Sequence, residues 1–265
     1  DEVIGAFVDD NILILSNGMF GERWFEISSF YNNNNTFYIK KKWGTPFDLN
    51  EIKKLIIHNK IKTVVVVHCD TSIGILNNIH AIGCIINEYN PHINFVVDAV
   101  SSFGGIPINM CESYIDILVT NPNKALASSM GVGIIIGRNT VLNNLTTMNK
   151  SYSLNLKRHY QYALKKETCN TCSISCINAL LYSLNASFNN KHDIVQYYDN
   201  YKLLFDILYN EIKYPKLLEY NISSPCIITI LCNESEKIIQ YLFDNGFVVY
   251  ECKGHLLNNG FQISL

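Results

Sequence analysis

Two residues that could do chemistry, Asp98 and Lys124, each follow a short apolar run of the sequence. The runs cover residues 93–98 and 115–119, and glycine, proline, asparagine or serine lies close to each. Short runs rich in β-branched residues indicate buried strands rather than helices. Ligands of open α/β sheets bind outside the carboxyl ends of the strands. The sequence therefore predicts that a carboxylate and an amine meet at such an edge.

This acid and this amine suit the chemistry of pyridoxal phosphate. The cofactor needs a lysine that bonds its aldehyde, and a carboxylate that keeps its ring nitrogen protonated so that the ring withdraws electrons. We interpret Lys124 and Asp98 as these two groups. Taken alone, the pair leaves a simpler explanation open, because an Asp after a strand is often a helix cap and a loop lysine is usually solvated.

Four segments around the pair carry a family resemblance. In chain order they are SNGMFGERW at 16–24, VHCDTSIGILNNI at 67–79, VVDAVSSFGGIPIN at 96–109 and NPNKALASSMGVG at 121–133. They resemble, in the same order, segments of the class V pyridoxal-phosphate aminotransferases, whose first two read SNG-aromatic-G-x-R and HCETTTGMLNPI. The similarity is greatest to members that act on 2-aminoethylphosphonate and pyruvate, and it covers nearly the whole chain.

The resemblance implies a fold, an activity and a partner. The fold is α/β of fold type I, with a mostly parallel, seven-stranded-type sheet, helices on both of its faces, and a smaller C-terminal α/β domain. The expected domains are residues 1–190 and 191–265. The implied reaction is transamination of 2-aminoethylphosphonate with pyruvate, which gives phosphonoacetaldehyde and L-alanine, in a homodimer whose subunits share the active site.

The resemblance also gives individual residues a role toward the cofactor. Phe20 stacks on the pyridine ring, although a phenylalanine at a helix start also suits plain core packing. Thr71 places a hydroxyl near the phenolic oxygen, and Val100 packs near the ring. Asn123 lies beside the phosphate, and because cysteine desulfurases carry a histidine there, it argues against desulfuration. Thr171 contacts the phosphate in the partner subunit.

The residue expected to bind the substrate's anionic group departs from the family. Members usually have Phe-Arg-Val or Phe-Arg-Ile in the last strand, and here Gln262 takes the place of that arginine. Arginine forms a bidentate charged pair, so its loss costs about 2–4 kcal/mol of binding. A register one residue different would place Gln262 on the surface. Arg23 is a second candidate for the substrate's anion, or else for a surface ion pair.

This departure leaves other functions open. One is an aminotransferase of the serine or alanine–glyoxylate type, or a lyase, on the same fold. Another is a catalytically degenerate protein of this fold. Against degeneration, Asp98, Lys124, Thr71 and Phe20 all keep the expected residue types.

Two other groups of residues resemble known sites and are set aside. His68 and Cys69 are adjacent, and neighbouring residues of an extended segment point to opposite faces, so they do not form a nucleophile pair. Cys169, Cys172 and Cys176 have half the spacing of a zinc site, but no second C-x-x-C pair or histidine pair completes it. No metal is predicted.

Composition sets the outer bounds of the interpretation. The 265 residues are 48% hydrophobic, which is enough for a sizeable core and one or two domains. A net charge of −2 implies no nucleic-acid partner, and there is no apolar run of the ~18 residues that a membrane span needs. The nine scattered cysteines are predicted to be free thiols of a cytoplasmic protein.

Two segments of the family have no counterpart in this sequence. One is an earlier Ser/Gly/Thr-rich helix start that would cradle the cofactor phosphate. The other is a closing helix after the last strand. We therefore expect the sequence to be part of a longer protein, and to be poorly soluble by itself.

The elements that must position the site are predicted from spacing and turn residues. Strands are expected at 11–15, 36–40, 63–68, 93–98 and 115–119, with an antiparallel return at 131–137. Helices are expected at 19–31, 50–59 and 74 to about 90. Residues 139–173 are polar and carry no predicted element. A helix is expected at 174–187, before the domain boundary. The smaller domain is expected to contain helices 193–214 and 234–245 and strands 225–231, 246–251 and 260–265.

Overall fold

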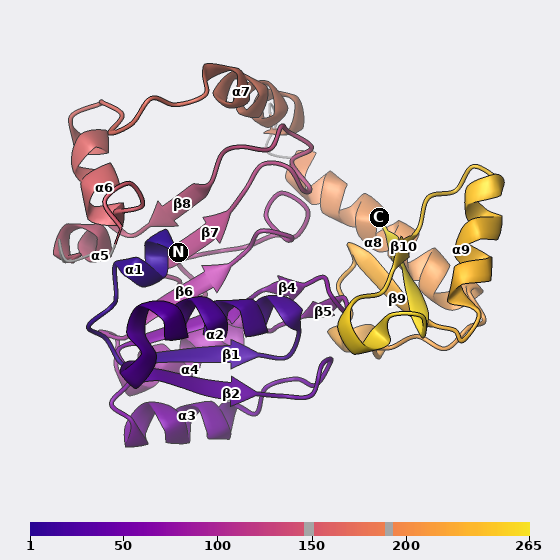
Figure 1. Ribbon diagram of the computed structural model, residues 1–265, viewed down its shortest axis with the longest axis horizontal. Helices are drawn as coiled ribbons and strands as arrows, with labels where there is room; N and C mark the ends of the chain where they lie inside the picture. The colour runs from indigo at the N-terminus through magenta and orange to yellow at the C-terminus, as the bar shows by residue number, and fades with distance from the viewer. Residues whose placement is uncertain (146–150, 189–192) are drawn as a thin grey trace.

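The computed structural model describes residues 1–145, 151–188 and 193–265. Its main sheet has six strands in the order β2-β1-β3-β6-β7-β8 (Figure 1). The strands are β1 (Ile12–Ser16), β2 (Thr36–Lys40), β3 (Thr63–Val67), β6 (Asn94–Asp98), β7 (Ile117–Thr120) and β8 (Ile134–Gly137). Five are parallel, and β8 pairs antiparallel with β7. The predicted fold class and the antiparallel return are both confirmed.

Helices bury both faces of this sheet. Strand residues alternate between the two sides, so Leu13 and Leu15 enter one core cluster while Ile12 and Ile14 enter the other. The first cluster is covered by α3 (Leu49–His58) and α4 (Ile79–Tyr89), and the second by α1 (Glu2–Gly5), α2 (Met19–Asn32) and α6 (Leu156–Leu164). Because helices cover both faces, the central strands β1, β3 and β6 are apolar except at their ends, and their polar side chains lie at those ends.

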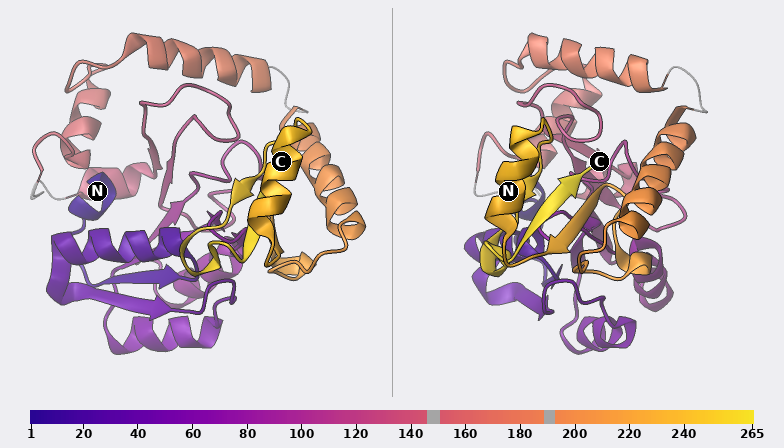
Figure 2. Two further views of the ribbon diagram at one scale, coloured as in Figure 1. Left: turned by 45° about the vertical axis from the view of Figure 1, so that its right-hand side comes forward. Right: turned by 90° about the vertical axis from the view of Figure 1, so that its right-hand side faces the viewer.

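A second, antiparallel sheet has the order β10-β11-β9. Its strands are β9 (Ile227–Leu231), β10 (Tyr250–Glu251) and β11 (Gly260–Ser264), and the helices beside it are α8 (Asp193–Glu211) and α9 (Ser235–Asp244). Figure 2 shows this unit at the carboxyl ends of the main strands. The predicted domain boundary between residues 190 and 191 lies outside the described residues and stays a prediction.

A hairpin joins the two sheets where a helix was predicted to begin at Gly74. That prediction is wrong, since β4 (Cys69–Asp70) pairs with β5 (Ile75–Leu76) and α4 starts only at Ile79. Gly74 lies in the turn with φ +83°, a conformation that glycine adopts without strain. Its carbonyl oxygen accepts a hydrogen bond from the Ser224 backbone at 2.7 Å, so the hairpin is tied to the second sheet.

Other element predictions also need correction. The polar stretch 139–173 contains two helices, α5 (Asn139–Asn144) and α6, and α7 (Ile174–Phe188) follows. The strand predicted over 246–251 is reduced to the two residues of β10. Short 3-10 turns occur at η1 (Asn33–Asn35), η2 (Tyr220–Ile222) and η3 (Gly254–Leu256). None of the described helices has the length and apolar character to cross a membrane.

Candidate active site

Asp98 and Lys124 meet at the carboxyl end of the main sheet, as predicted. Asp98 is the last residue of β6, and Lys124 lies in the loop after the neighbouring strand β7. Both line one cavity of about 380 Å³, together with Phe20 of α2 and Val100. A carboxylate at the end of one strand and an amine from the loop after the neighbouring parallel strand therefore line one cavity.

A second cavity of about 490 Å³ adjoins the first. The two cavities share three lining residues: Phe20, Ser101 and Lys124. The second is also lined by residues predicted for the site from three different segments: Thr71, Asn123 and Gln262. Arg23 lines the first cavity. The fold thus brings together every predicted site residue except Thr171.

Asp98 is held in place by two donors. Trp24 donates its indole Nε1–H to one carboxylate oxygen at 2.7 Å, and the Val100 backbone N–H donates to the other at 2.9 Å. Burial raises the pKa of Asp98, and these hydrogen bonds partly oppose that rise. A cation against the carboxylate would stabilise its ionised form further.

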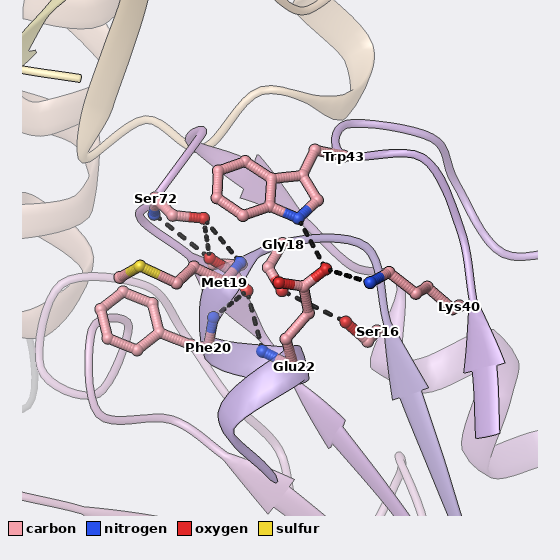
Figure 3. Close-up of polar contacts among 10 residues, drawn as sticks. Ser16, Gly18, Met19, Phe20, Glu22, Lys40, Trp43 and Ser72 are labelled. Atoms are coloured by element: carbon pink, nitrogen blue, oxygen red, sulfur yellow. Dashed lines mark hydrogen bonds and ion pairs between the residues drawn. The ribbon is translucent and has the colours of Figure 1, made fainter. Parts of the chain in front are cut away.

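The turn before Phe20 is fixed by a second buried carboxylate. Asp70 accepts hydrogen bonds from the backbone N–H of Phe20 at 3.0 Å and of Gly21 at 3.1 Å. It also accepts one from the Ser72 hydroxyl at 2.6 Å, and that hydroxyl oxygen accepts from the Met19 N–H at 3.0 Å. Figure 3 shows Ser72 beside this helix start. A carboxylate at a helix N-terminus accepts hydrogen bonds from the free N–H groups of the helix, so Asp70 fixes the position of Phe20.

Gly18 is required by this arrangement. A Cβ atom at Gly18 would lie 2.4 Å from Cγ of Asp70, which is far inside contact distance. The glycine of the SNG turn therefore lets the buried carboxylate approach the helix. This gives the sequence motif a steric reason.

Gln262 is a buried bridge between the two sheets. It is 4% exposed, so the surface alternative considered from the sequence is wrong. Its Nε2 lies within hydrogen-bond distance of the carbonyl oxygens of Thr71 at 3.0 Å and Ser72 at 3.2 Å, and of the Thr229 hydroxyl at 2.9 Å. The two amide hydrogens are thus engaged by protein groups, and the side chain adds no charge to the cavity.

Comparison with known proteins identifies the architecture around this site. The family model described as aminotransferase class-V matches residues 9–213. The chain belongs to the class-V aminotransferase family. Members of this family depend on pyridoxal phosphate.

Two curated relatives cover most of the chain. One, from Clostridioides difficile, is a bifunctional phosphonoacetaldehyde hydrolase/aminoethylphosphonate transaminase, 30% identical across 96% of this chain and 41% of its own length. The other, a 2-aminoethylphosphonate–pyruvate transaminase from Lysinibacillus sphaericus, is 29% identical across 92% of this chain and 68% of its own. The chain thus spans less than half of the first relative and about two thirds of the second.

A solved structure shows the same fold. The alanine–glyoxylate aminotransferase from Nostoc sp. superposes with a TM-score of 0.86 at 19% identity, over 100% of this chain and 73% of that one. The match confirms fold type I for this class-V aminotransferase.

The residues of the two cavities fit the family's cofactor. The side-chain oxygen Oδ1 of Asn121 is buried without a hydrogen-bond partner and belongs to the cavity that holds Asp98 and Lys124. A buried oxygen without a donor is costly unless a ligand group pairs with it. Lys124 would bond the cofactor, Asp98 would hold its ring nitrogen, and Phe20 would contribute an aromatic face.

Sequence reasoning missed Asn121 and Trp24 as parts of the site. Trp24 lies inside the quoted SNGMFGERW segment and four residues after Phe20, so helical spacing places both on one face of α2. That spacing was a usable signal. Asn121 had none, because an asparagine in a polar loop is unremarkable in sequence.

His68 contacts Ser102, its Nδ1 lying 2.9 Å from the Ser102 hydroxyl. Burial lowers the pKa of His68 to about 4, which makes its imidazole a weak base. Burial raises the pKa of the Cys69 thiol strongly, which disfavours the nucleophilic thiolate. Both effects disfavour a nucleophile pair at these two residues.

Thr171 lies away from the other predicted residues. It is exposed and lines a separate cavity beside α6, together with Cys169 and Cys172. Its role toward a partner subunit stays a prediction. In the part of the chain that the structure describes, no three His, Cys, Asp or Glu side chains are grouped to hold a metal ion.

Proposed function

We propose that this class-V aminotransferase transfers the amino group of 2-aminoethylphosphonate to pyruvate, forming phosphonoacetaldehyde and L-alanine. The observation that carries the proposal is the cavity that Asp98 and Lys124 line together with Phe20. The names of the two curated relatives supply the substrates.

Lys124 has the central task. Its Nζ would hold the cofactor when no substrate is bound. With substrate bound, the Lys124 amine would be free to act as the general base that takes the proton from the amine-bearing carbon, positioned by the loop after β7. In the second half of the reaction the same amine returns a proton to the carbon that becomes C2 of alanine.

Asp98 and Phe20 support this proton movement. When bound, pyridoxal phosphate supplies a ring that draws electrons from the substrate carbon. The ionised Asp98 would keep a positive charge on the ring nitrogen. Phe20, whose backbone N–H is bound by Asp70, would offer an aromatic face to the ring, and Val100, which lines the same cavity, would pack near it. Thr71 and Asn123 line the adjoining cavity, where polar groups of the cofactor are expected.

We infer that the protein acts as a homodimer. Helix α7 stands apart from the main sheet in Figures 1 and 2, and exposes Ile174 (71%), Leu181 (56%) and Tyr182 (78%). A second copy that covers this apolar face would bring Thr171, just before α7, toward the partner's cofactor. Thr171 would then complete a site that neither chain completes alone.

An absorbance experiment tests the reaction. The purified protein with added pyridoxal phosphate is expected to show the visible band of a lysine-bound cofactor. 2-Aminoethylphosphonate should bleach the band, and pyruvate should restore it. Lys124→Ala should remove both the band and turnover, while Lys54→Ala, an exposed lysine of α3, should leave both unchanged.

Each outcome has a clear meaning. A band that ignores 2-aminoethylphosphonate but bleaches with alanine or serine would keep the enzyme class and overturn the substrate. Near-normal turnover by Lys124→Ala would contradict the assigned role of this lysine. The absence of any band in the parent protein would contradict the proposed function as a whole.

A further inference from the structure

The cavity that contains Gln262 needs a positive charge if its substrate carries a phosphonate. Gln262 is neutral, and its Nε2 already contacts three protein acceptors. Moving an anion out of water into a protein cavity is unfavourable unless a cation or several donors replace its hydration. A phosphonate in this cavity therefore requires a cation, among the residues that line the two cavities, that is not committed elsewhere.

Three cationic side chains line the two cavities in the described residues: Lys124, Arg23 and Lys253. Lys124 is assigned to the cofactor. Arg23 lies over the Phe20 ring, with its guanidinium carbon 5.5 Å from the ring centroid, and faces the same cavity as the Asp98 carboxylate. Only Lys253 shares the Gln262 cavity in addition to Lys124.

The backbone around Lys253 is held on both sides. Strand β10 pairs with β11 so that Tyr250 lies opposite Gln262, and Cys252, the residue before Lys253, is 1% exposed. After it, a Cβ on Gly254 would lie 2.7 Å from the Trp43 ring. The position of Lys253 is thus set by packing, while its own side chain is exposed.

Trp43 in turn ties this loop to the helix that carries Phe20. Its Nε1–H donates to Glu22 Oε1 at 3.2 Å, and Lys40 Nζ lies 3.0 Å from the same oxygen (Figure 3). The rings of Trp43 and His255 are 4.5 Å apart. One set of contacts therefore places the Lys253 loop and α2 on the same cavity.

The ammonium group of Lys253 is available for a ligand. Among the described residues, no ion pair joins it to a carboxylate. Glu251 lines the same cavity and opposes an anion there. With Lys124 assigned to the cofactor, Lys253 is the lysine of this cavity that can offset the Glu251 carboxylate and attract an anion.

We propose that Lys253 binds the phosphonate group of the amino donor and supplies the charge that Gln262 does not. The inference rests on the proposed function, because it places the anionic end of that substrate. It makes Lys253, rather than Gln262 or Arg23, the residue that selects an anionic amine over a neutral one.

Binding of methylphosphonate, measured by calorimetry on the cofactor-loaded protein, tests this without turnover. Lys253→Ala should weaken methylphosphonate binding about tenfold, since a charge-assisted hydrogen bond is lost. Lys253→Arg should keep most of the affinity, and Lys54→Ala should match the parent protein. In steady-state assays, Lys253→Ala should raise KM for 2-aminoethylphosphonate about tenfold while kcat changes little.

The results separate this inference from the proposed function. Unchanged methylphosphonate affinity in Lys253→Ala, or no binding by the parent protein, would overturn the role of Lys253. Weaker binding of pyridoxal phosphate with unchanged KM would also overturn it, because Lys253 would then hold the cofactor's phosphate. If methylphosphonate binding depends on Lys253 but 2-aminoethylphosphonate does not bleach the visible band, the phosphonate site at Lys253 stands and the proposed reaction fails.

Discussion

Asp98 accepts hydrogen bonds from Trp24 and Val100, yet burial raises the pKa of its carboxyl in the free protein. In the native state it therefore binds its proton at higher pH than in the unfolded chain. Within that range the native state holds more protons, so the free energy of unfolding contributed by Asp98 falls as the pH rises above 3.8. The cofactor needs Asp98 in its ionised form, and burial in the cofactor-free protein disfavours that form.

Asp98→Asn tests whether burial of the Asp98 carboxylate costs stability while its charge serves the cofactor. The cofactor-free variant should lose less stability than the parent protein as the pH rises above 3.8, because its amide does not ionise. Its absolute stability should be lower by about 1–3 kcal/mol, since one of the two N–H donors then faces an amide NH₂. With cofactor, kcat should fall about 100-fold.

Thermal unfolding across pH measures the first effect, and steady-state kinetics measures the second. Asp244→Asn, a change at an exposed residue of α9, serves as the control and should leave both unchanged. Parallel pH profiles of the parent protein and Asp98→Asn would contradict the assigned burial of the charge.

At the scale of elements, the start of α2 depends on a glycine and a carboxylate that are 52 residues apart. Gly18→Ala would drive a methyl group into Asp70, so we expect the free energy of unfolding to fall by about 1–3 kcal/mol. Because Phe20 is fixed by the same carboxylate, pyridoxal phosphate should also bind more weakly.

Chemical denaturation and cofactor titration measure these two changes. Gly133→Ala is a matched control, because a Cβ at Gly133 would meet nothing within 4 Å. If Gly18→Ala and Gly133→Ala behaved alike in both measurements, the α2 start would not be the support for Phe20 that the contacts indicate.

The positions of strands and loops also show which parts of the site could be predicted from the sequence. Asp98 and Lys124 were predicted to meet because the carboxyl ends of neighbouring parallel strands share one edge, a rule that needs no coordinates. The hairpin before α4 was missed because its strands have two residues each, too few for a period of two to be recognised. Gly74 then resembled a helix start, although it lies in the hairpin turn.

The remaining failures concern contacts between distant segments. Gln262 was judged by its type alone, and its partner Thr71 lies 191 residues away. Lys253 was not predicted as a site residue, because a single lysine in a loop belongs to no recognisable sequence motif. Both acquire meaning only when the second sheet docks on the hairpin, and a local pattern does not contain that information.

For the molecule as a whole, the proposed dimer can be tested by mixing inactive variants. Asp98 and Lys124 of one chain line one cavity, whereas Thr171 lies in another. If Thr171 serves the partner's site, Thr171→Ala should lower activity about tenfold by removing a hydrogen bond to the phosphate. Lys124→Ala should be inactive.

After subunit exchange between these two variants, a mixed dimer holds one intact site. That site takes Lys124 from the Thr171→Ala chain and Thr171 from the Lys124→Ala chain. An equal mixture should therefore reach about one quarter of the parent activity, because half of the dimers are mixed and each has one of two sites restored. Lys124→Ala mixed with Asp98→Asn should regain nothing, since both residues belong to the same chain's site. A Thr171→Ala mixture that gains no more than this control would show that each chain builds its site alone.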